Sequence, residues 1–154
     1  MILHFAYGSN MSRSLMWRRC PGAQEVGTAT IRGWRFIISS DGFGSIEPRP
    51  GGVVHGVLWR LGPRDLAAIN AYESLDSGLY VRRTLPVRYR RQTMPALVYI
   101  SRRRAEGRPR PGYMAVVEDA ARDWQLPKRY IQALRRWAPA ALDGTRWKDT
   151  GEVG

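Results

Sequence analysis

A chain of 154 residues can bury an apolar core as one domain, without disulfides or a structural metal. Its only cysteine, Cys20, excludes an intrachain disulfide, and no apolar run approaches the roughly 20 residues that span a bilayer. The net charge of +12 admits a polyanionic partner, yet 23 of the 25 basic residues are arginine, which indicates a compositional bias. We therefore expect a cytoplasmic protein with a solvated basic surface, and with neither a membrane nor a nucleic-acid partner.

The N-terminal segment predicts a strand that turns through glycine into a helix. Residues 2–6 are apolar, Tyr7-Gly8-Ser9-Asn10 follows, and the next helix runs from about Ser12 towards Cys20. Asn10 and Ser12 are both suitable N-caps, because each side-chain oxygen can accept a backbone N–H. Backbone N–H groups after such a turn converge on one spot that can hold an anion or an oxyanion. An ordinary strand–turn–helix without a ligand fits the same residues.

The next segments predict strands interrupted by turn residues. Strands are expected at residues 28–39 and 53–61, with a turn at residues 41–44 between them. An extended segment from Ile46 is expected to break at residues 48–52, where two prolines and two glycines occur. Within the strand at residues 53–61, Gly56 indicates a bulge or a close approach of the backbone.

The C-terminal half predicts a hairpin and then two helices. Strands at residues 80–89 and 94–100 are expected to pair across residues 91–93, and a basic loop follows at residues 102–112. The two helices have apolar stripes at Met114, Val117, Ala121 and Trp124, and at Tyr130, Ile131, Leu134 and Trp137. These elements predict an α+β fold with a mostly antiparallel or mixed sheet. We expect one domain of residues 1–142 and a loosely ordered tail at residues 143–154.

A carboxylate occupies the apolar face of the helix predicted at residues 64–74. Glu73 follows Ile69 by four residues and Leu66 by seven, so all three share one face at 3.6 residues per turn. Burial at a helix C-terminus would raise the pKa of Glu73 towards that of a base working near neutrality. The alternative is a helix that frays by Tyr72 and leaves Glu73 in water; the pattern alone favours neither.

Metal, nucleotide and nucleophile sites have little support in the sequence. His4 and His55 occupy apolar strands without a partner at metal-ligand spacing, so we expect structural histidines. No glycine-rich phosphate-binding loop occurs. Arg18 and Arg19 beside Cys20 favour a lowered thiol pKa, but no base adjoins the thiol and we assign it no catalytic role. We expect no metal and no cofactor.

Three separated motifs resemble those of the γ-glutamylcyclotransferase family. They are Phe5-Ala6-Tyr7-Gly8-Ser9-Asn10-Met11, then Tyr72-Glu73-Ser74-Leu75-Asp76-Ser77-Gly78-Leu79-Tyr80, then Pro111-Gly112-Tyr113 with Leu126-Pro127-x-x-Tyr130. The motifs occur in the order expected for the family, and together they span nearly the whole chain. The resemblance implies a small mixed, mostly antiparallel β-barrel flanked by helices, with a cavity at the Tyr-Gly-Ser-Asn turn.

The resemblance also implies an activity and a set of site residues. The family releases 5-oxoproline from γ-glutamyl amides by intramolecular attack, without a cofactor. Glu73 would be the general base and acid. The substrate-binding residues would be Tyr7, Gly8, Ser9, Asn10, Tyr80 and Tyr113, although Tyr7 suits a packing role equally well. We expect a small γ-glutamyl substrate and a monomer or homodimer.

Two further expectations concern charge. The arginines at residues 102–110 suggest a preference for an acidic leaving group. The alternative function is a non-catalytic module on the same fold that binds an anion or a nucleic acid.

Overall fold

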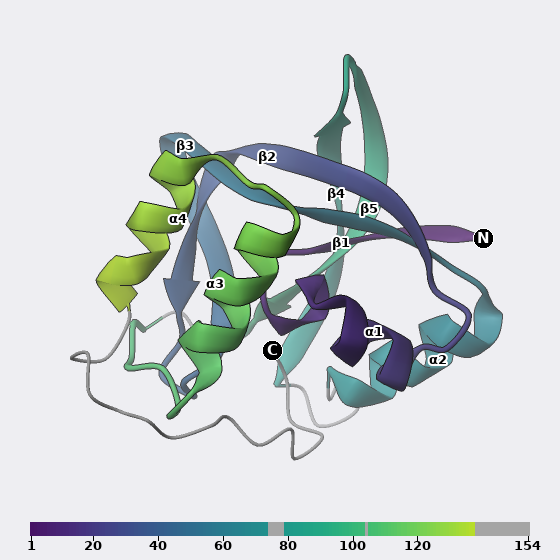
Figure 1. Cartoon of the computed structure of the whole chain (residues 1–154), viewed down its shortest axis with the longest axis horizontal. Coiled ribbons are helices and arrows are strands. Elements are labelled where there is room, and N and C mark those ends of the chain that lie inside the picture. The colour runs from purple at the N-terminus through teal and green to yellow at the C-terminus, as the bar shows by residue number, and fades with distance from the viewer. Residues whose placement is uncertain (74–78, 104, 138–154) are drawn as a thin grey trace.

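The computed structural model describes residues 1–73, 79–103 and 105–137, which build a closed five-stranded barrel (Figure 1). The strands are β1 (Ile2–Ala6), β2 (Gln24–Ile38), β3 (Gly44–Leu61), β4 (Tyr80–Tyr89) and β5 (Gln92–Ser101). Their order around the barrel is β1-β3-β2-β4-β5. All neighbours pair antiparallel except β1 and β5, which are parallel at His4 and Leu97. This is the mixed, mostly antiparallel barrel expected from the sequence.

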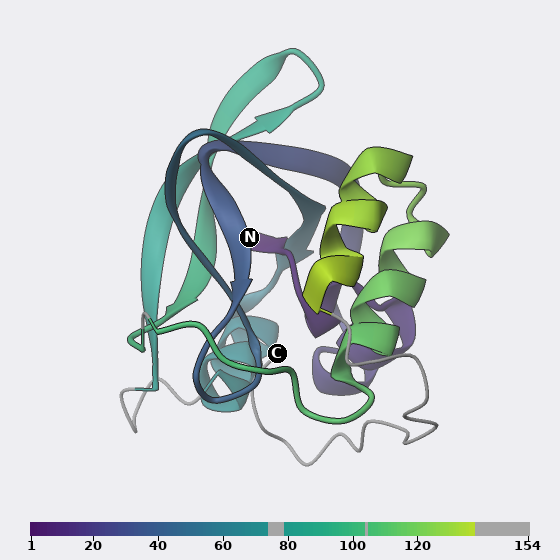
Figure 2. The same cartoon turned by 90° about the vertical axis from the view of Figure 1, so that its left-hand side faces the viewer.

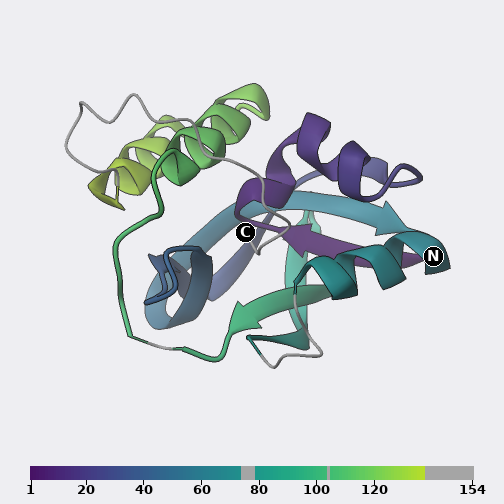
Figure 3. The same cartoon turned by 90° about the horizontal axis from the view of Figure 1, so that it is seen from below.

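Helices cover the barrel in two pairs. Their bounds are α1 (Arg13–Arg19), α2 (Pro63–Tyr72), α3 (Tyr113–Asp123) and α4 (Lys128–Leu134), with short 3₁₀ turns η1 (Ser9–Met11) and η2 (Arg135–Trp137). Helices α3 and α4 lie side by side along the barrel (Figure 2), as their two buried stripes predict. Helices α1 and α2 lie together at another side, close to β1 (Figure 3). None of the described helices is long and apolar enough to cross a membrane.

The predicted break at residues 48–52 is wrong, because β3 runs continuously through it. Its pairing with β2 passes from Trp34↔Pro48 directly to Arg32↔Val53, with a register shift at that point. The prolines therefore sit at an irregularity where ladder hydrogen bonds are already interrupted, which is where a sheet tolerates them. The close approach expected at Gly56 is confirmed, since a Cβ there would lie 2.2 Å from the Ala6 carbonyl oxygen.

Other strand boundaries differ by a few residues from the prediction. Strand β2 begins at Gln24 rather than residue 28, because a bulge at Gly27 lets pairing with β3 continue. The β4–β5 turn lies at Arg90 and Arg91 rather than at residues 91–93, and Arg90 takes a positive φ of 55°. Residues 74–78 of the second family motif and the predicted tail at residues 143–154 lie outside the described residues.

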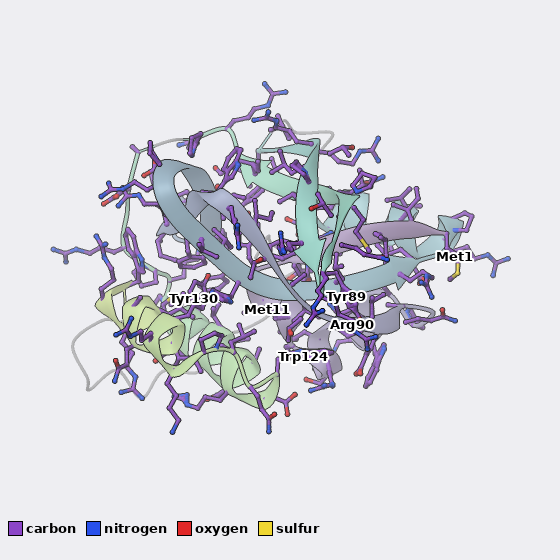
Figure 4. The ribbon with its side chains drawn as sticks, turned by 90° about the horizontal axis from the view of Figure 1, so that it is seen from above. Met1, Met11, Tyr89, Arg90, Trp124 and Tyr130 are labelled. Carbon is purple, nitrogen blue, oxygen red and sulfur yellow. The ribbon has the colours of Figure 1, made fainter. Side chains whose placement is uncertain are left out.

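Two indole groups, of the buried Trp59 and the partly buried Trp124, anchor the turn that follows β1. The Trp59 Nε1–H donates to the Asn10 carbonyl oxygen at 3.1 Å. The Trp124 Nε1–H donates to the Met11 carbonyl oxygen at 2.7 Å, and Figure 4 labels Met11 and Trp124. Trp59 comes from β3 and Trp124 from the end of α3. The barrel and its helical cover thus both hold η1 in place.

Candidate active site

The Tyr-Gly-Ser-Asn segment forms a tight 3₁₀ turn between β1 and α1. The Met11 N–H donates to the Gly8 carbonyl oxygen at 3.0 Å, and the Ser12 N–H donates to the Ser9 carbonyl oxygen at 2.9 Å. Ser12 is the N-cap of α1, where its Oγ accepts from the Leu15 N–H at 3.3 Å. Of the two expected caps, Ser12 is the one used. Asn10 is buried, and its side chain is available for other contacts.

Glu73 lies in the core, directly after the last residue of α2. Its N–H donates to the Ile69 carbonyl oxygen at 2.8 Å, so the helical geometry persists to this residue. Its exposed fraction is 2%, which confirms the buried interpretation and rules out the frayed one. The fully buried stripe of α2 consists of Asp65, Ile69 and Glu73, whereas Leu66 is only partly buried. The Asp65 carboxylate accepts from the Gly22 N–H at 3.1 Å.

The Asn10 side chain joins the turn to this carboxylate. Its Nδ2–H donates to Glu73 Oε1 at 2.9 Å, across 63 positions of sequence. Glu73 Oε2 is buried and has no hydrogen-bond partner among the described residues. Burial raises the pKa of Glu73 to about 8, although the charge of Arg19 and the Asn10 hydrogen bond both act to lower it. A carboxyl with this pKa can exchange a proton near neutrality.

Three tyrosines point their hydroxyl groups at backbone on neighbouring strands. Tyr7 donates to the Tyr99 carbonyl oxygen, and Tyr80 donates to the Gly44 carbonyl oxygen at 2.8 Å. The Tyr113 hydroxyl accepts from the Gly44 N–H at 3.1 Å. Burial raises the pKa of all three phenols, and the nearby Glu73 raises each further. They are therefore neutral groups at any physiological pH.

A small cavity of about 10 Å³ lies between Glu73 and the turn. Its lining residues are His4, Phe5, Ala6, Tyr7, Gly8, Asn10, Glu73 and Tyr99. Four residues expected from the sequence thus meet at one place, namely Tyr7, Gly8, Asn10 and Glu73. Ser9, Tyr80 and Tyr113 do not line it. Tyr113 and Tyr80 instead share Gly44 as a partner, at the start of β3.

Comparison with known proteins agrees with this architecture. Residues 53–134, more than half of the chain, match the model of the AIG2-like family. The chain belongs to the AIG2-like family. It is 26% identical to the gamma-glutamylcyclotransferase of Mus musculus over 92% of this chain and 81% of that one, and 24% identical to the Homo sapiens protein over the same shares.

A solved structure of a gamma-glutamyl cyclotransferase superposes on this AIG2-like chain with a TM-score of 0.86. The match covers 96% of this chain and 94% of that one at 23% sequence identity, and it shows that the two share a fold. The resemblance noted in the sequence and the fold that it implied are both confirmed.

Two residues of the site in this AIG2-like chain were missed by sequence reasoning. The Arg19 guanidinium donates to Ser9 Oγ at 3.1 Å and also to Asn10 Oδ1, so it contacts the turn directly. His4 lines the cavity, and burial lowers its pKa to about 4, which keeps the ring neutral.

The lowered thiol pKa expected for Cys20 is wrong, because burial outweighs the charge of Arg19 and raises the pKa to about 11. Among the described residues, no acidic, histidine or cysteine cluster could hold a metal ion.

Proposed function

We propose that this chain is a γ-glutamylcyclotransferase that converts a γ-glutamyl amide to 5-oxoproline and a free amine or amino acid. One observation carries the proposal: Glu73 is buried, has a pKa of about 8, and lies at hydrogen-bond distance from Asn10 of the Tyr-Gly-Ser-Asn turn. A buried carboxylate on the apolar face of a helix opposes the folding pattern, and such conflicts concentrate at functional sites. The curated relatives that carry this activity in their names support it further.

The proposed reaction needs a base before any bond is made. The substrate α-amine is an ammonium at neutral pH and cannot attack until it loses a proton. Glu73 in its ionised form takes that proton, and the amine nitrogen then attacks the γ-carbonyl carbon to close a five-membered lactam. The bond between the γ-carbonyl carbon and the amide nitrogen breaks. Glu73 returns its proton to the departing nitrogen. The attacking nitrogen must lose a second proton to become the lactam N–H, and the same carboxylate passes that proton to the released amine, which leaves as an ammonium. The cycle consumes no water and leaves the carboxylate as it began.

The remaining site residues would bind and orient the substrate. The nucleophile and the electrophile belong to one molecule, so the protein mainly needs to hold the reactive rotamer. Backbone N–H groups of Gly8, Ser9 and Asn10 would hold the substrate carboxylate or the γ-carbonyl oxygen as it gains negative charge. The neutral phenols of Tyr80 and Tyr113 would add polar surface without a competing charge. No step requires a cofactor.

The direct experiment is mass-spectrometric detection of 5-oxoproline. The wild-type protein and Glu73→Gln are each incubated with γ-glutamyl dipeptides, glutathione and γ-glutamyl amines. Glutamine is nearly isosteric but cannot accept the proton, so we expect product from wild type and a loss of about 10²- to 10⁴-fold in kcat in the variant. The matched control is Glu118→Gln, which changes a buried glutamate of α3 whose carboxylate contacts Arg135. It should leave turnover unchanged.

Each outcome of this experiment has a definite meaning. Product from the wild type and the Glu118 variant, but not from Glu73→Gln, supports both the reaction and its base. The ranking of substrates would then identify the γ-glutamyl compound that is turned over best. A folded wild-type protein that releases no 5-oxoproline from any compound would overturn the proposal and favour a non-catalytic anion-binding module.

A further inference from the structure

Arg19, the last residue of α1, connects three separate parts of the site. Its Nη1 donates to Ser9 Oγ and to Asn10 Oδ1 in the turn. Its Cζ also lies 3.6 Å from the centroid of the Tyr72 ring, and Tyr72 immediately precedes Glu73. One guanidinium therefore touches the turn after β1 and the C-terminus of α2 together. The side chain is partly buried, which strengthens these contacts relative to those of an exposed arginine.

The contact with Asn10 decides which way its carboxamide faces. A guanidinium only donates hydrogen bonds, so the group facing it must be the amide oxygen. The amide NH₂ then faces Glu73 Oε1, at 2.9 Å from Nδ2. A flipped amide would set its NH₂ against the Arg19 cation and its oxygen against the Glu73 carboxylate. Arg19 thus excludes the wrong orientation through its hydrogen bond to Asn10 Oδ1.

The orientation of Asn10 in turn distinguishes the two oxygens of Glu73. Oε1 accepts the Asn10 N–H, and a proton placed on Oε1 in that direction would collide with it. Oε2 is buried and has no partner among the described residues, so it is the oxygen that can carry a proton. We propose that Arg19 is a positioning residue that locks the Asn10 carboxamide, so that Glu73 exchanges its proton through Oε2. The inference rests on the proposed function for its catalytic meaning, but its geometry is independent of it.

Other titratable groups lie near Glu73 and could change the pH dependence of any measurement on this site. They are His4 from β1, Tyr7 directly after it, Tyr80 from β4, Tyr99 from β5, Tyr113 from α3, and Cys20 after α1. Burial raises the pKa of the phenols and the thiol and lowers that of His4, so all are neutral between pH 6 and 9. Arg19 is therefore the charged group that acts on Glu73, and it lowers the pKa of that carboxyl.

The test is a double-mutant cycle of Arg19→Met and Asn10→Ala, measured as kcat/KM over pH 5.5–9. Each single variant should lose about 10- to 100-fold, the range expected for a hydrogen bond to a charged group. The charge of Arg19 acts on the pKa of Glu73 directly, so the losses are compared in the pH-independent limit of kcat/KM, where Glu73 is ionised in every variant. Because Arg19 orients the Asn10 carboxamide, the double variant should there lose little more than Asn10→Ala alone. In Arg19→Met the acidic limb of the profile should also move to higher pH. Arg18→Met, the exposed neighbour on the same helix, is the control and should match wild type.

Two results would overturn this role for Arg19. They are additive losses in the double variant, or an acidic limb in Arg19→Met that coincides with wild type. Titration of ¹³C-labelled glutamate by NMR, with Glu73→Gln for assignment, reads the same carboxyl without turnover. A higher Glu73 pKa in Arg19→Met but not in Arg18→Met supports the inference even if no γ-glutamyl compound is cleaved; equal values in both would refute it. Absence of turnover in wild type speaks only against the proposed function.

Discussion

Replacing Glu73 by glutamine should stabilise the protein at alkaline pH even as it removes the proposed base. The carboxylate has a 2% exposed fraction and a pKa raised by burial from its ordinary 4.5 to about 8. At about 1.4 kcal/mol per pH unit, this interval corresponds to roughly 5 kcal/mol of free energy of unfolding. That is a large part of the stability of a domain of this size.

The sign follows from the number of protons bound in each state. Below pH 4.5, Glu73 is protonated in both the folded and the unfolded chain, and pH has no effect through this group. Between pH 4.5 and about 8 the folded chain keeps a proton that the unfolded chain has lost, so the free energy of unfolding falls as pH rises. Above about pH 8 the carboxylate is ionised in both states and the full penalty is present.

Urea unfolding of wild type and Glu73→Gln at steps from pH 5 to pH 9 measures this penalty. Glutamine can still accept from Asn10 through its oxygen, and its NH₂ replaces Oε2 at a cost that does not depend on pH. The difference in free energy of unfolding should therefore grow with pH in favour of the variant and level off above about pH 8. Glu118→Gln, which changes a carboxylate in contact with Arg135, is measured alongside as the control. Parallel curves for wild type and Glu73→Gln would refute a buried carboxyl with a raised pKa.

Two further changes test the fold and the substrate preference. In urea unfolding, Gly56→Ala should lower the free energy of unfolding by about 1–3 kcal/mol, because the new Cβ would lie 2.2 Å from the Ala6 carbonyl oxygen. The control is Val53→Ala on the exposed part of β3, which should change the free energy of unfolding by less than about 0.5 kcal/mol. If the proposed function holds, the arginines at residues 102–110 predict that γ-Glu-Glu is cleaved faster than γ-Glu-Lys, with a smaller difference in Arg102→Gln. Equal kcat/KM for the two dipeptides would contradict this preference.

Local pattern was sufficient for the helices, but it left the burial of Glu73 open. An α-helix fixes its faces by counting, so the position of Glu73 four residues after the buried Ile69 placed it on the core side. The amphipathic stripes of α3 and α4 followed from the same rule. Only the exact end of α2 was uncertain from the sequence, and tertiary burial settled it in favour of helical geometry at Glu73.

Pairing between strands was harder to predict, because it depends on partners distant in the sequence. Prolines at residues 48 and 50 ordinarily end a strand, and local propensity alone predicted a break there. The register shift opposite Arg32 and Trp34 supplies the irregularity that accommodates them. Gly33 and Gly51 take positive φ angles at this irregularity, and a Cβ at Gly52 would lie 2.5 Å from the Trp34 carbonyl oxygen. The glycines permit the shift, but its register depends on the pairing of β2 with β3 and cannot be found from either strand alone.

The role of Arg19 was beyond sequence reasoning for the same reason. Arg18 and Arg19 form an ordinary basic pair at a helix end, and the sequence does not distinguish them. The difference arises only when α1 and α2 pack together, which brings Arg19 onto Tyr72 and Asn10 and leaves Arg18 exposed. Sequence motifs can identify the individual residues of a site that is built from three segments. The contacts that orient those residues are visible only in the packed structure.

The destabilising burial of Glu73 and its proposed catalytic use depend on the same balance of charges. Burial alone acts to keep the carboxyl protonated, and a protonated carboxyl cannot accept the substrate's proton. Arg19 and Asn10 offset part of that effect and bring the pKa to about 8, at which roughly one tenth of Glu73 is ionised at pH 7. If Arg19 and Asn10 lowered the pKa of Glu73 less, too small a fraction of the carboxyl would be ionised at neutral pH. If they lowered it more, the carboxylate would be too weakly basic to take a proton from an ammonium. Asn10 at Glu73 Oε1, and Arg19 at Asn10 Oδ1, therefore suit Glu73 to both steps of the proposed proton transfer.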